Sequence, residues 1–292
     1  MSEHIDAMKR AIEFRKPAHL PMEVMDVPGI YNAYHTLDPN QVELIPGTET
    51  FDSLWPCCYS WIHHVIGRTP EGEVLKKDQF GAVLKTPRDE NSTYVLLEHP
   101  LADKDTLAGY HFPNPDDADA HYDDLGNVIK ERYPDRFVDA FIDAGMFLTT
   151  QLLFGLEGFL MKLADNPAFV ADVYERVMEY YRAVIPKFKK AGAHMITAIE
   201  DIGSTDSLLI NPDVWRRYFK PVTKRFFKHV HDEGLYTGIC IDGNSRDVLD
   251  DLLDMDIDLF TVVDIKTTGI DAIKGKLKGK MCVKASVDMQ ST

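Results

Sequence analysis

Two side chains near the end of one predicted strand, Cys240 and Asp242, have the types and spacing of a metal site. They lie in the β-branched run Leu235–Asp242, and residues i and i+2 of a strand project from the same face. A thiolate beside a carboxylate suits Zn²⁺, with a third ligand from a neighbouring strand and one position left open. Glu200 or Asp201, on the preceding predicted strand, would supply that ligand. The alternative for Cys240 is a small buried hydrophobe, the usual role of a free cysteine.

Carboxylates recur at the ends of the predicted strands. Six strands end in an acid, and a seventh ends at Asp52 or Trp55; the six ends are Asp26, Asp143, Glu200-Asp201, Asp242, Asp264 and Asp288. In a βα barrel the active site lies at the carboxyl ends of the strands, so these acids predict a ring around it. The alternative is that each Asp caps the helix that follows its strand.

The elements that must position these residues alternate along the chain. Asn211-Pro212 and Asn166-Pro167 each place a capping side chain before a helix-starting proline, and the helices they open run towards Gly234 and Gly192. Shorter helices are expected around Val248–Leu253 and Ile270–Leu277. The strands between and before the helices are Leu20–Asp26, Phe51–Trp55, Phe137–Gly145, His194–Ile202, Leu235–Asp242, Leu259–Ile265 and Met281–Asp288.

Strands that alternate with helices at this spacing predict an α/β fold with parallel βα units, a (β/α)₈ TIM-type barrel. Phe80–Lys85 and Tyr94–Glu98, separated by a polar turn, predict an antiparallel hairpin inserted between barrel units. We therefore expect a single barrel domain over residues 1–292. Because seven parallel strands are found and a barrel needs eight, we expect the last strand to lie beyond Thr292.

The net charge of the chain limits the kinds of molecule that it is expected to bind. It has 32 basic and 47 acidic residues, a formal net charge of −15, which argues against binding nucleic acid or an anionic membrane. No apolar run approaches the ~20 residues of a membrane helix, and the polar stretch Met1–Arg10 is no signal peptide. Four scattered cysteines are too few for a disulfide framework. We expect a cytoplasmic protein.

A set of landmarks resembles the uroporphyrinogen decarboxylase superfamily, and more closely its corrinoid-dependent methyltransferase branch. The likeness spans nearly the whole chain, and it begins at Arg10-Ala11-Ile12 and Leu20-Pro21. Its other landmarks are Asp78-Gln79-Phe80-Gly81, Glu98-His99-Pro100-Leu101, Glu200-Asp201-Ile202-Gly203, the segment from Leu208 to Trp215, Phe219-Lys220-Pro221, the segment from His231 to Tyr236, Asp242-Gly243-Asn244 and the segment from Ser286 to Gln290.

The resemblance implies a site with altered ligands. The branch has His-x-Cys-Gly-Asn where this chain reads Cys240-Ile241-Asp242-Gly243-Asn244, so both metal positions are replaced by residues that still bind zinc. The implied zinc ligands are Cys240, Asp242 and Glu200, and Asn244 is the implied cofactor-binding residue. The third ligand of the thiol-methylating members is a cysteine on the last strand, which here would follow Thr292. Because the implied zinc site of this chain contains carboxylates, it resembles the zinc sites of the O-demethylase members instead.

The implied reaction moves a methyl group from a small methylated donor, a methyl ether, to the cobalt of a corrinoid on a carrier protein. Zinc would stabilise the charge on the ether oxygen, and Asp201, with Glu200 beside it, would deliver a proton to that oxygen. Two alternatives stay open: a metal-independent decarboxylase or lyase that uses the acidic ring alone, and a catalytically inactive relative that binds the carrier. The sequence identifies neither the methyl donor nor the oligomeric state, although related enzymes are often homodimers.

Overall fold

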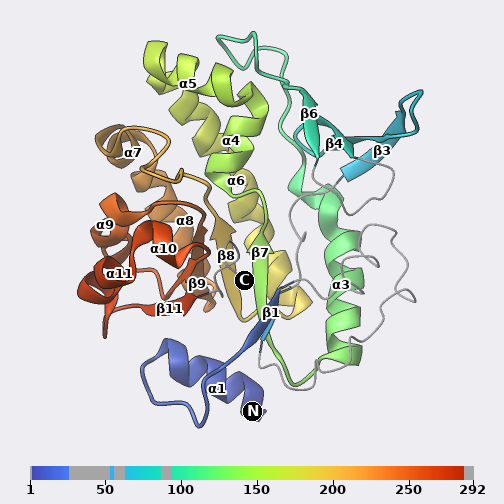
Figure 1. Cartoon of the computed structure of the whole chain (residues 1–292). Coiled ribbons are helices and arrows are strands. Elements are labelled where there is room, and N and C mark those ends of the chain that lie inside the picture. The colour runs from blue at the N-terminus through green and yellow to red at the C-terminus, as the bar shows by residue number, and fades with distance from the viewer. Residues whose placement is uncertain (1, 26–52, 56–62, 87–93, 286–292) are drawn as a thin grey trace.

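A parallel sheet of seven strands forms the centre of the molecule (Figure 1). The computed structural model describes residues 2–25, 53–55, 63–86 and 94–285. The strands follow one another in the sheet in chain order, and every neighbouring pair is parallel. They are β1 (Glu23–Met25), β2 (Ser53–Trp55), β7 (Phe137–Ile142), β8 (Met195–Ile199), β9 (Tyr236–Ile241), β10 (Leu259–Val262) and β11 (Cys282–Ala285).

The seven predicted parallel strands and their order are confirmed. The closed eight-stranded barrel is not: within the described residues β1 and β11 end the sheet on either side and do not pair with each other. The eighth strand, expected beyond Thr292, lies outside the described residues and stays a prediction. The described strands are also shorter than predicted. In β7, β8, β9 and β10 the last residues of the predicted run leave the ladder and enter the loops.

A second, antiparallel sheet lies beside the first (Figure 1). It contains β3 (His63–Arg68), β4 (Val74–Asp78), β5 (Val83–Thr86) and β6 (Val95–Glu98) in that order. The predicted hairpin corresponds to β5 and β6, which here form half of a four-stranded sheet. Strand β5 starts later than predicted because Asp78 closes a turn, with its Oδ1 accepting from the Ala82 N–H at 2.8 Å.

Helices cover the parallel sheet, and their strongest start signals are confirmed. Asn166 accepts from the Phe169 N–H and Asn211 from the Asp213 N–H, each directly before a proline. The helices are α1 (Glu3–Ile12), α3 (Asp119–Arg132), α4 (Met146–Phe154), α5 (Leu156–Asp165), α6 (Pro167–Ala191), α7 (Pro212–Tyr218), α8 (Lys220–Asp232), α9 (Leu249–Asp254), α10 (Ile265–Thr268) and α11 (Ile270–Leu277), with 3₁₀ turns η3 (Pro115–Ala118) and η4 (Arg246–Val248).

The single helix predicted from Asn211 towards Gly234 is two helices. It breaks at Phe219, between α7 and α8, where Pro221 falls within the first turn of α8. Proline lacks the N–H that a continuous helix needs and its ring crowds the preceding turn, so the chain restarts there. Within the described residues no single helix is long and apolar enough to cross a membrane, and only α4 with α5, bent by 95°, passes that test as a pair.

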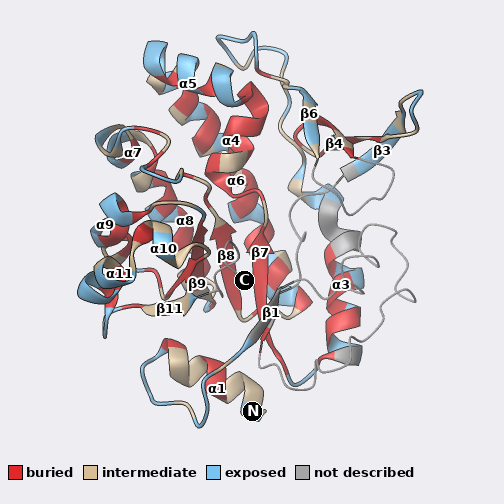
Figure 2. Ribbon diagram, viewed as in Figure 1, coloured by how far each residue is buried: buried red, intermediate tan, exposed pale blue. Residues whose placement is uncertain are grey.

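The central strands β7 to β10 are buried on both faces, as expected of a parallel sheet covered by helices (Figure 2). The outward face packs on the helices: Val138, Ile196 and Ile239 belong to the main apolar cluster, together with residues of α6 and α8. At the amino-terminal end of the strands, Met8 and Ile12 of α1 pack on Phe137 and Leu259. Side chains alternate between the two faces of each strand, so the residues between these outward ones point to a second, inward face, where a site could lie.

Candidate active site at the strand ends

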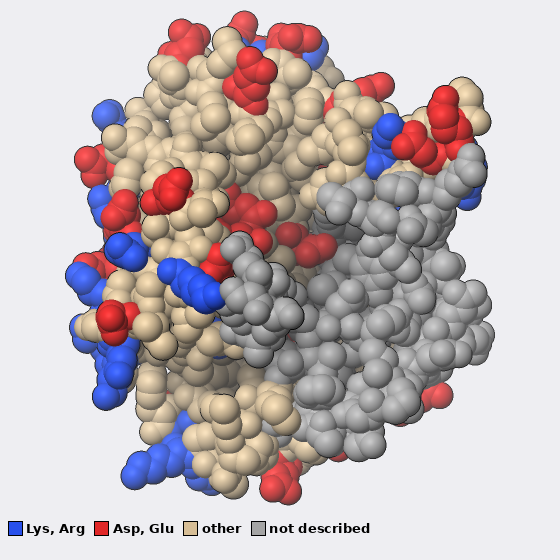
Figure 3. Space-filling view, in the orientation of Figure 1, with Lys and Arg blue, Asp and Glu red and all other residues tan. Residues whose placement is uncertain are grey.

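The inward face ends in three aspartates on adjacent strands. Phe141 of β7 and Cys240 of β9 form an apolar cluster, against which Ile199 of β8 packs. Asp143, Asp201 and Asp242 each follow one of these residues by two positions, so alternation places their side chains on the same face. We call the site that these three aspartates form, at the carboxyl ends of the strands, the mouth. Acidic side chains gather in a hollow at the centre of the face shown in Figure 3. The predicted acidic ring is thus present on these three strands.

Asp201 is largely buried at the mouth. This burial, together with the nearby charges of Asp242 and Asp143, raises its pKa to about 6. Its Oδ1 is buried and has no hydrogen-bond partner in the described part of the chain. A carboxyl group with these surroundings holds and releases a proton near neutral pH, which suits general acid and base catalysis.

The next acids along the mouth have different surroundings. Asp242 is more exposed than Asp201, and partial burial, with the charge of Asp264, raises its pKa. Asp264 caps α10, since its Oδ1 accepts from the N–H groups of Lys266 at 3.0 Å and Thr267 at 3.2 Å. The capping alternative therefore applies to Asp264, whereas no helix cap involves Asp201 or Asp242 in the described residues.

Tyr94 joins the mouth from the antiparallel sheet. Burial, with the charges of Asp143, Asp201 and Asp78, raises its pKa to about 12, so its hydroxyl remains protonated at neutral pH. Tyr94 was expected in the inserted hairpin, and no role was predicted for its side chain. Only the docking of the second sheet against the strand ends brings it beside the aspartates, and no local pattern could have shown this.

Glu200 points away from the mouth. It is 2% exposed, and its two oxygens accept from the Met146 and Phe147 N–H groups, at 3.0 and 2.8 Å, at the start of α4. Burial raises its pKa to about 8, although these two hydrogen bonds oppose the rise. A Cβ at Gly145 would lie 1.9 Å from the Ile199 carbonyl oxygen, so only glycine allows this close approach. Glu200 thus anchors α4 to β8.

The predicted zinc ligands are not brought together. Cys240 and Asp242 share the inward face, but Glu200 is on the opposite face of β8, where backbone N–H groups occupy its oxygens. Cys240 is 2% exposed in the apolar cluster, and burial raises the pKa of its thiol, which disfavours the thiolate that binds zinc. Across the described residues no three His, Cys, Asp or Glu side chains could hold a metal ion.

Asn244, the implied cofactor-binding residue, links two loops at the mouth. Its Nδ2 donates to the Asp206 carbonyl at 3.0 Å, and its Oδ1 accepts from the Arg246 N–H at 3.1 Å. These bonds tie the loop after β8 to the loop after β9. A direct contact with a cofactor stays a prediction.

A buried charge pair that the sequence analysis missed lies under the apolar cluster. Asp139 is fully buried, accepts from the Thr197 hydroxyl at 2.7 Å and lies 3.5 Å from the Lys284 ammonium. Lys284 also lies 5.2 Å from the centre of the Phe141 ring. The sequence offered one signal for this pair: each of two apolar strands has a charged residue on its inward face.

Several predicted residues cannot be placed. The strand-end acids Asp26, Asp52 and Asp288 lie outside the described residues. The side chain of Trp55 is not described either.

Comparisons with known proteins agree with this architecture. The family model described as uroporphyrinogen decarboxylase (URO-D) matches residues 75–287. A solved structure, a methyltransferase from Methanosarcina mazei, superposes with a TM-score of 0.57 at 18% identity and shows the same fold. The match covers 66% of this chain and 56% of that one. No curated protein matches the chain in sequence.

Proposed function

Because the chain belongs to the uroporphyrinogen decarboxylase family, we propose that its mouth of aspartates catalyses methyl transfer from a small methylated donor to a corrinoid carrier protein. The observation that carries the proposal is Asp201, a partly buried acid at a strand end whose pKa is raised to about 6. The similar fold of a methyltransferase supports the reaction class.

The donor expected from the sequence is a methyl ether, and Asp201 addresses its main chemical difficulty. An alkoxide or phenoxide leaves badly, so the oxygen must gain a proton as its bond to the methyl carbon breaks. The bonding pair stays on the oxygen, and the Asp201 carboxyl supplies the proton. When bound, the carrier's corrinoid supplies a reduced cobalt as the nucleophile for the methyl group. Asp143 and Asp242 raise the pKa of Asp201, so it is protonated more readily at working pH.

Zinc has no assigned step in this reaction. Cys240 and Asp242 are two donors on one face, and a third would have to come from outside the described residues. Should zinc bind, it would supply a Lewis acid for the ether oxygen.

Proton transfer by the same acids also fits the metal-independent decarboxylase or lyase. The mismatch between the predicted zinc ligands and the described site favours keeping this second candidate. A site lined by Asp143, Asp201 and Asp242 would repel a substrate with many carboxylates, such as a porphyrinogen, so a less charged substrate is expected.

The test is a methyl-transfer assay with methyl ethers and a reduced corrinoid, with and without a strong chelator. We expect turnover in the wild type and a loss of about 100-fold in Asp201→Asn, whose side chain has the same shape but no proton to give. The matched control is Asp250→Asn, since Asp250 is exposed on α9. Metal content of the wild type and of Cys240→Ser tests zinc separately. Full activity of Asp201→Asn would refute the proposed role.

A further inference from the structure

A second pocket lies beside the mouth, between the segments that follow β9 and β10. It has a volume of about 680 Å³, and Arg246, Lys266 and Ile270 are among the residues that line it. We propose that this pocket binds a small organic anion, with its carboxylate or phosphate group on Arg246 and its apolar part on Ile265 and Ile270. This site goes beyond the proposed function, and its binding chemistry does not depend on methyl transfer.

The Arg246 guanidinium is held in place from behind. Its Nε donates to the Thr268 carbonyl oxygen at 3.1 Å. Gly269 follows directly, and a Cβ there would lie 2.9 Å from an Nη of Arg246, so the guanidinium packs against bare backbone. Gly269 also has a φ of +90°, which few other residues adopt. The side chain is therefore oriented before any ligand arrives.

Hydrogen bonds connect the residues behind Arg246. The Thr268 hydroxyl donates to the Gly243 carbonyl at 3.2 Å and lies 3.0 Å from the Ser245 hydroxyl. The Ser245 backbone N–H donates to the same Thr268 hydroxyl. Ser245 and Thr268 are both fully buried. These bonds join the loop after β9 to the end of α10, so the two walls of the pocket form one unit.

Arg246 lines this pocket and has no carboxylate partner among the described residues; Arg68 and Arg217 also lack one, but neither lines the pocket. Other arginines, such as Arg182, Arg176 and Arg225, each lie against an aspartate or glutamate. Within the described residues, Nε is the only guanidinium nitrogen of Arg246 that has a protein acceptor. Its remaining N–H groups form a planar fork that suits the paired oxygens of a carboxylate or phosphate.

The other lining residues define the rest of the ligand. The ammonium group of Lys266 adds positive charge, while Asp271 on the same pocket opposes it and limits the site to one anionic group. Ile270 is 61% exposed and Ile265 lines the pocket beside it, so an apolar body gains by covering them. The geometry fits an anionic head on a compact apolar group.

Calorimetric titration of the full-length protein with benzoate, phenyl phosphate and neutral benzamide tests the site. We expect saturable binding of at least one anion and at least tenfold weaker binding of benzamide. The better anion identifies the head group as carboxylate or phosphate. Arg246→Gln should weaken anion binding at least tenfold and leave benzamide unchanged. Arg246→Lys, which keeps the charge but loses the fork, should fall between the two.

The matched control is Arg176→Gln, since Arg176 is exposed on α6 and distant in sequence from the pocket. It should bind the anions as the wild type does. Equal affinity for benzamide and both anions, or wild-type anion affinity in Arg246→Gln, would overturn the proposal. Because no methyl donor or corrinoid takes part, this failure is distinguishable from failure of the proposed methyl transfer.

Discussion

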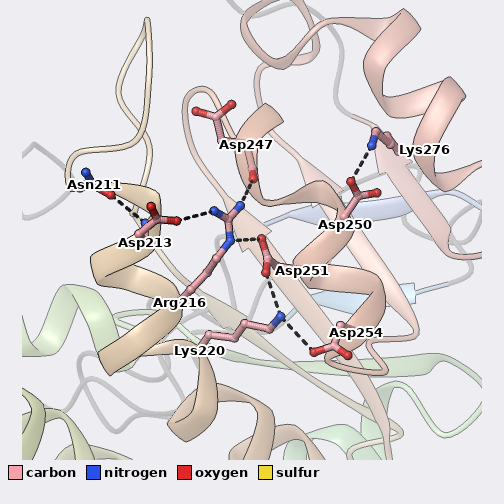
Figure 4. Close-up of polar contacts among 9 residues, drawn as sticks. All are labelled: Asn211, Asp213, Arg216, Lys220, Asp247, Asp250, Asp251, Asp254 and Lys276. Atoms are coloured by element: carbon pink, nitrogen blue, oxygen red, sulfur yellow. Dashed lines mark hydrogen bonds and ion pairs between the residues drawn. The ribbon is translucent and has the colours of Figure 1, made fainter.

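Aspartates in two regions of the molecule have opposite surroundings. Among the helices that cover the sheet, the nearly buried Asp251 of α9 accepts from Arg216 at 3.0 Å and from Lys220 at 2.8 Å, within a network of alternating charges (Figure 4). At the mouth, Asp201 and Asp242 face one another and no ion pair to a described residue involves either. The charge of Asp251 is thus compensated by cations, and the charges of the acids of the mouth are not.

This difference in surroundings indicates which aspartates stabilise the fold and which are candidates for catalysis. A paired carboxylate stabilises the fold and stays ionised, whereas a partly buried carboxylate among like charges costs stability and gains a raised pKa. Residues held at such a cost are candidates for catalysis. Substitutions in the two regions should therefore affect stability with opposite sign.

The largest expected effect is on activity, in Asp201→Asn. Methyl transfer should fall about 100-fold because the proton donor is lost. The free energy of unfolding should stay unchanged or rise, because the repulsion from Asp143 and Asp242 is relieved. Urea unfolding of the variant beside the wild type measures this. A marked loss of stability would mean that Asp201 is structural, like Asp251.

Glu200→Ala should give the largest loss of stability, about 2–3 kcal/mol. It leaves the Met146 and Phe147 N–H groups buried without an acceptor. Chemical denaturation gives the value, and Glu157→Ala on the exposed face of α5 serves as a control with little change. A loss below about 0.5 kcal/mol would show that water replaces the carboxylate.

Asp251→Ala should cost about 2 kcal/mol, because it leaves Arg216 and Lys220 without their shared partner. The loss stays below that of a fully buried pair, since Arg216 is 40% exposed and can turn to solvent. Unfolding at low and high salt checks the origin: the difference between variant and wild type should shrink as salt rises. A salt-independent loss would point to packing instead.

Stability should also fall as pH rises from about 5 to 8. The ordinary pKa of glutamate is 4.5 and that of folded Glu200 is about 8, so between these values the unfolded chain has lost a proton that the folded chain keeps. One such proton contributes up to about 1.4 kcal/mol per pH unit. Glu200→Gln, measured by urea unfolding across this range, should flatten the slope. An unchanged slope would assign it to other groups.

The smallest effect is expected for the exposed pair of Lys276 and Asp250, whose side chains are 51% and 68% exposed. Asp250→Asn should change the free energy of unfolding by no more than about 0.5 kcal/mol. Thermal unfolding with that variant sets the baseline for the others. A larger change would show that the surface network acts cooperatively.

Much of the architecture could be predicted because its signals are local. Asn166 and Asn211 cap helices before prolines, and these short patterns need no distant partner. The alternation of strands and helices predicts a parallel sheet, and the acids at strand ends predict the mouth. The four-stranded sheet and the break at Phe219 were missed, the first because its strands pair across loops and the second because Pro221 interrupts an otherwise regular pattern.

The arrangement of the candidate site depends partly on the sequence pattern and partly on tertiary packing. Alternation alone requires Glu200 and Asp201 to face opposite sides of β8, so the sequence determines that only one of them reaches the mouth. Which one does so depends on where α4 begins in space, since its first N–H groups bind Glu200 and leave Asp201 inward. Tyr94 beside Asp201, and Lys284 beside Asp139, likewise join segments far apart in the chain. Sequence patterns record the short-range preferences of the backbone, whereas these partnerships arise only when the packed sheets and helices fix which faces meet.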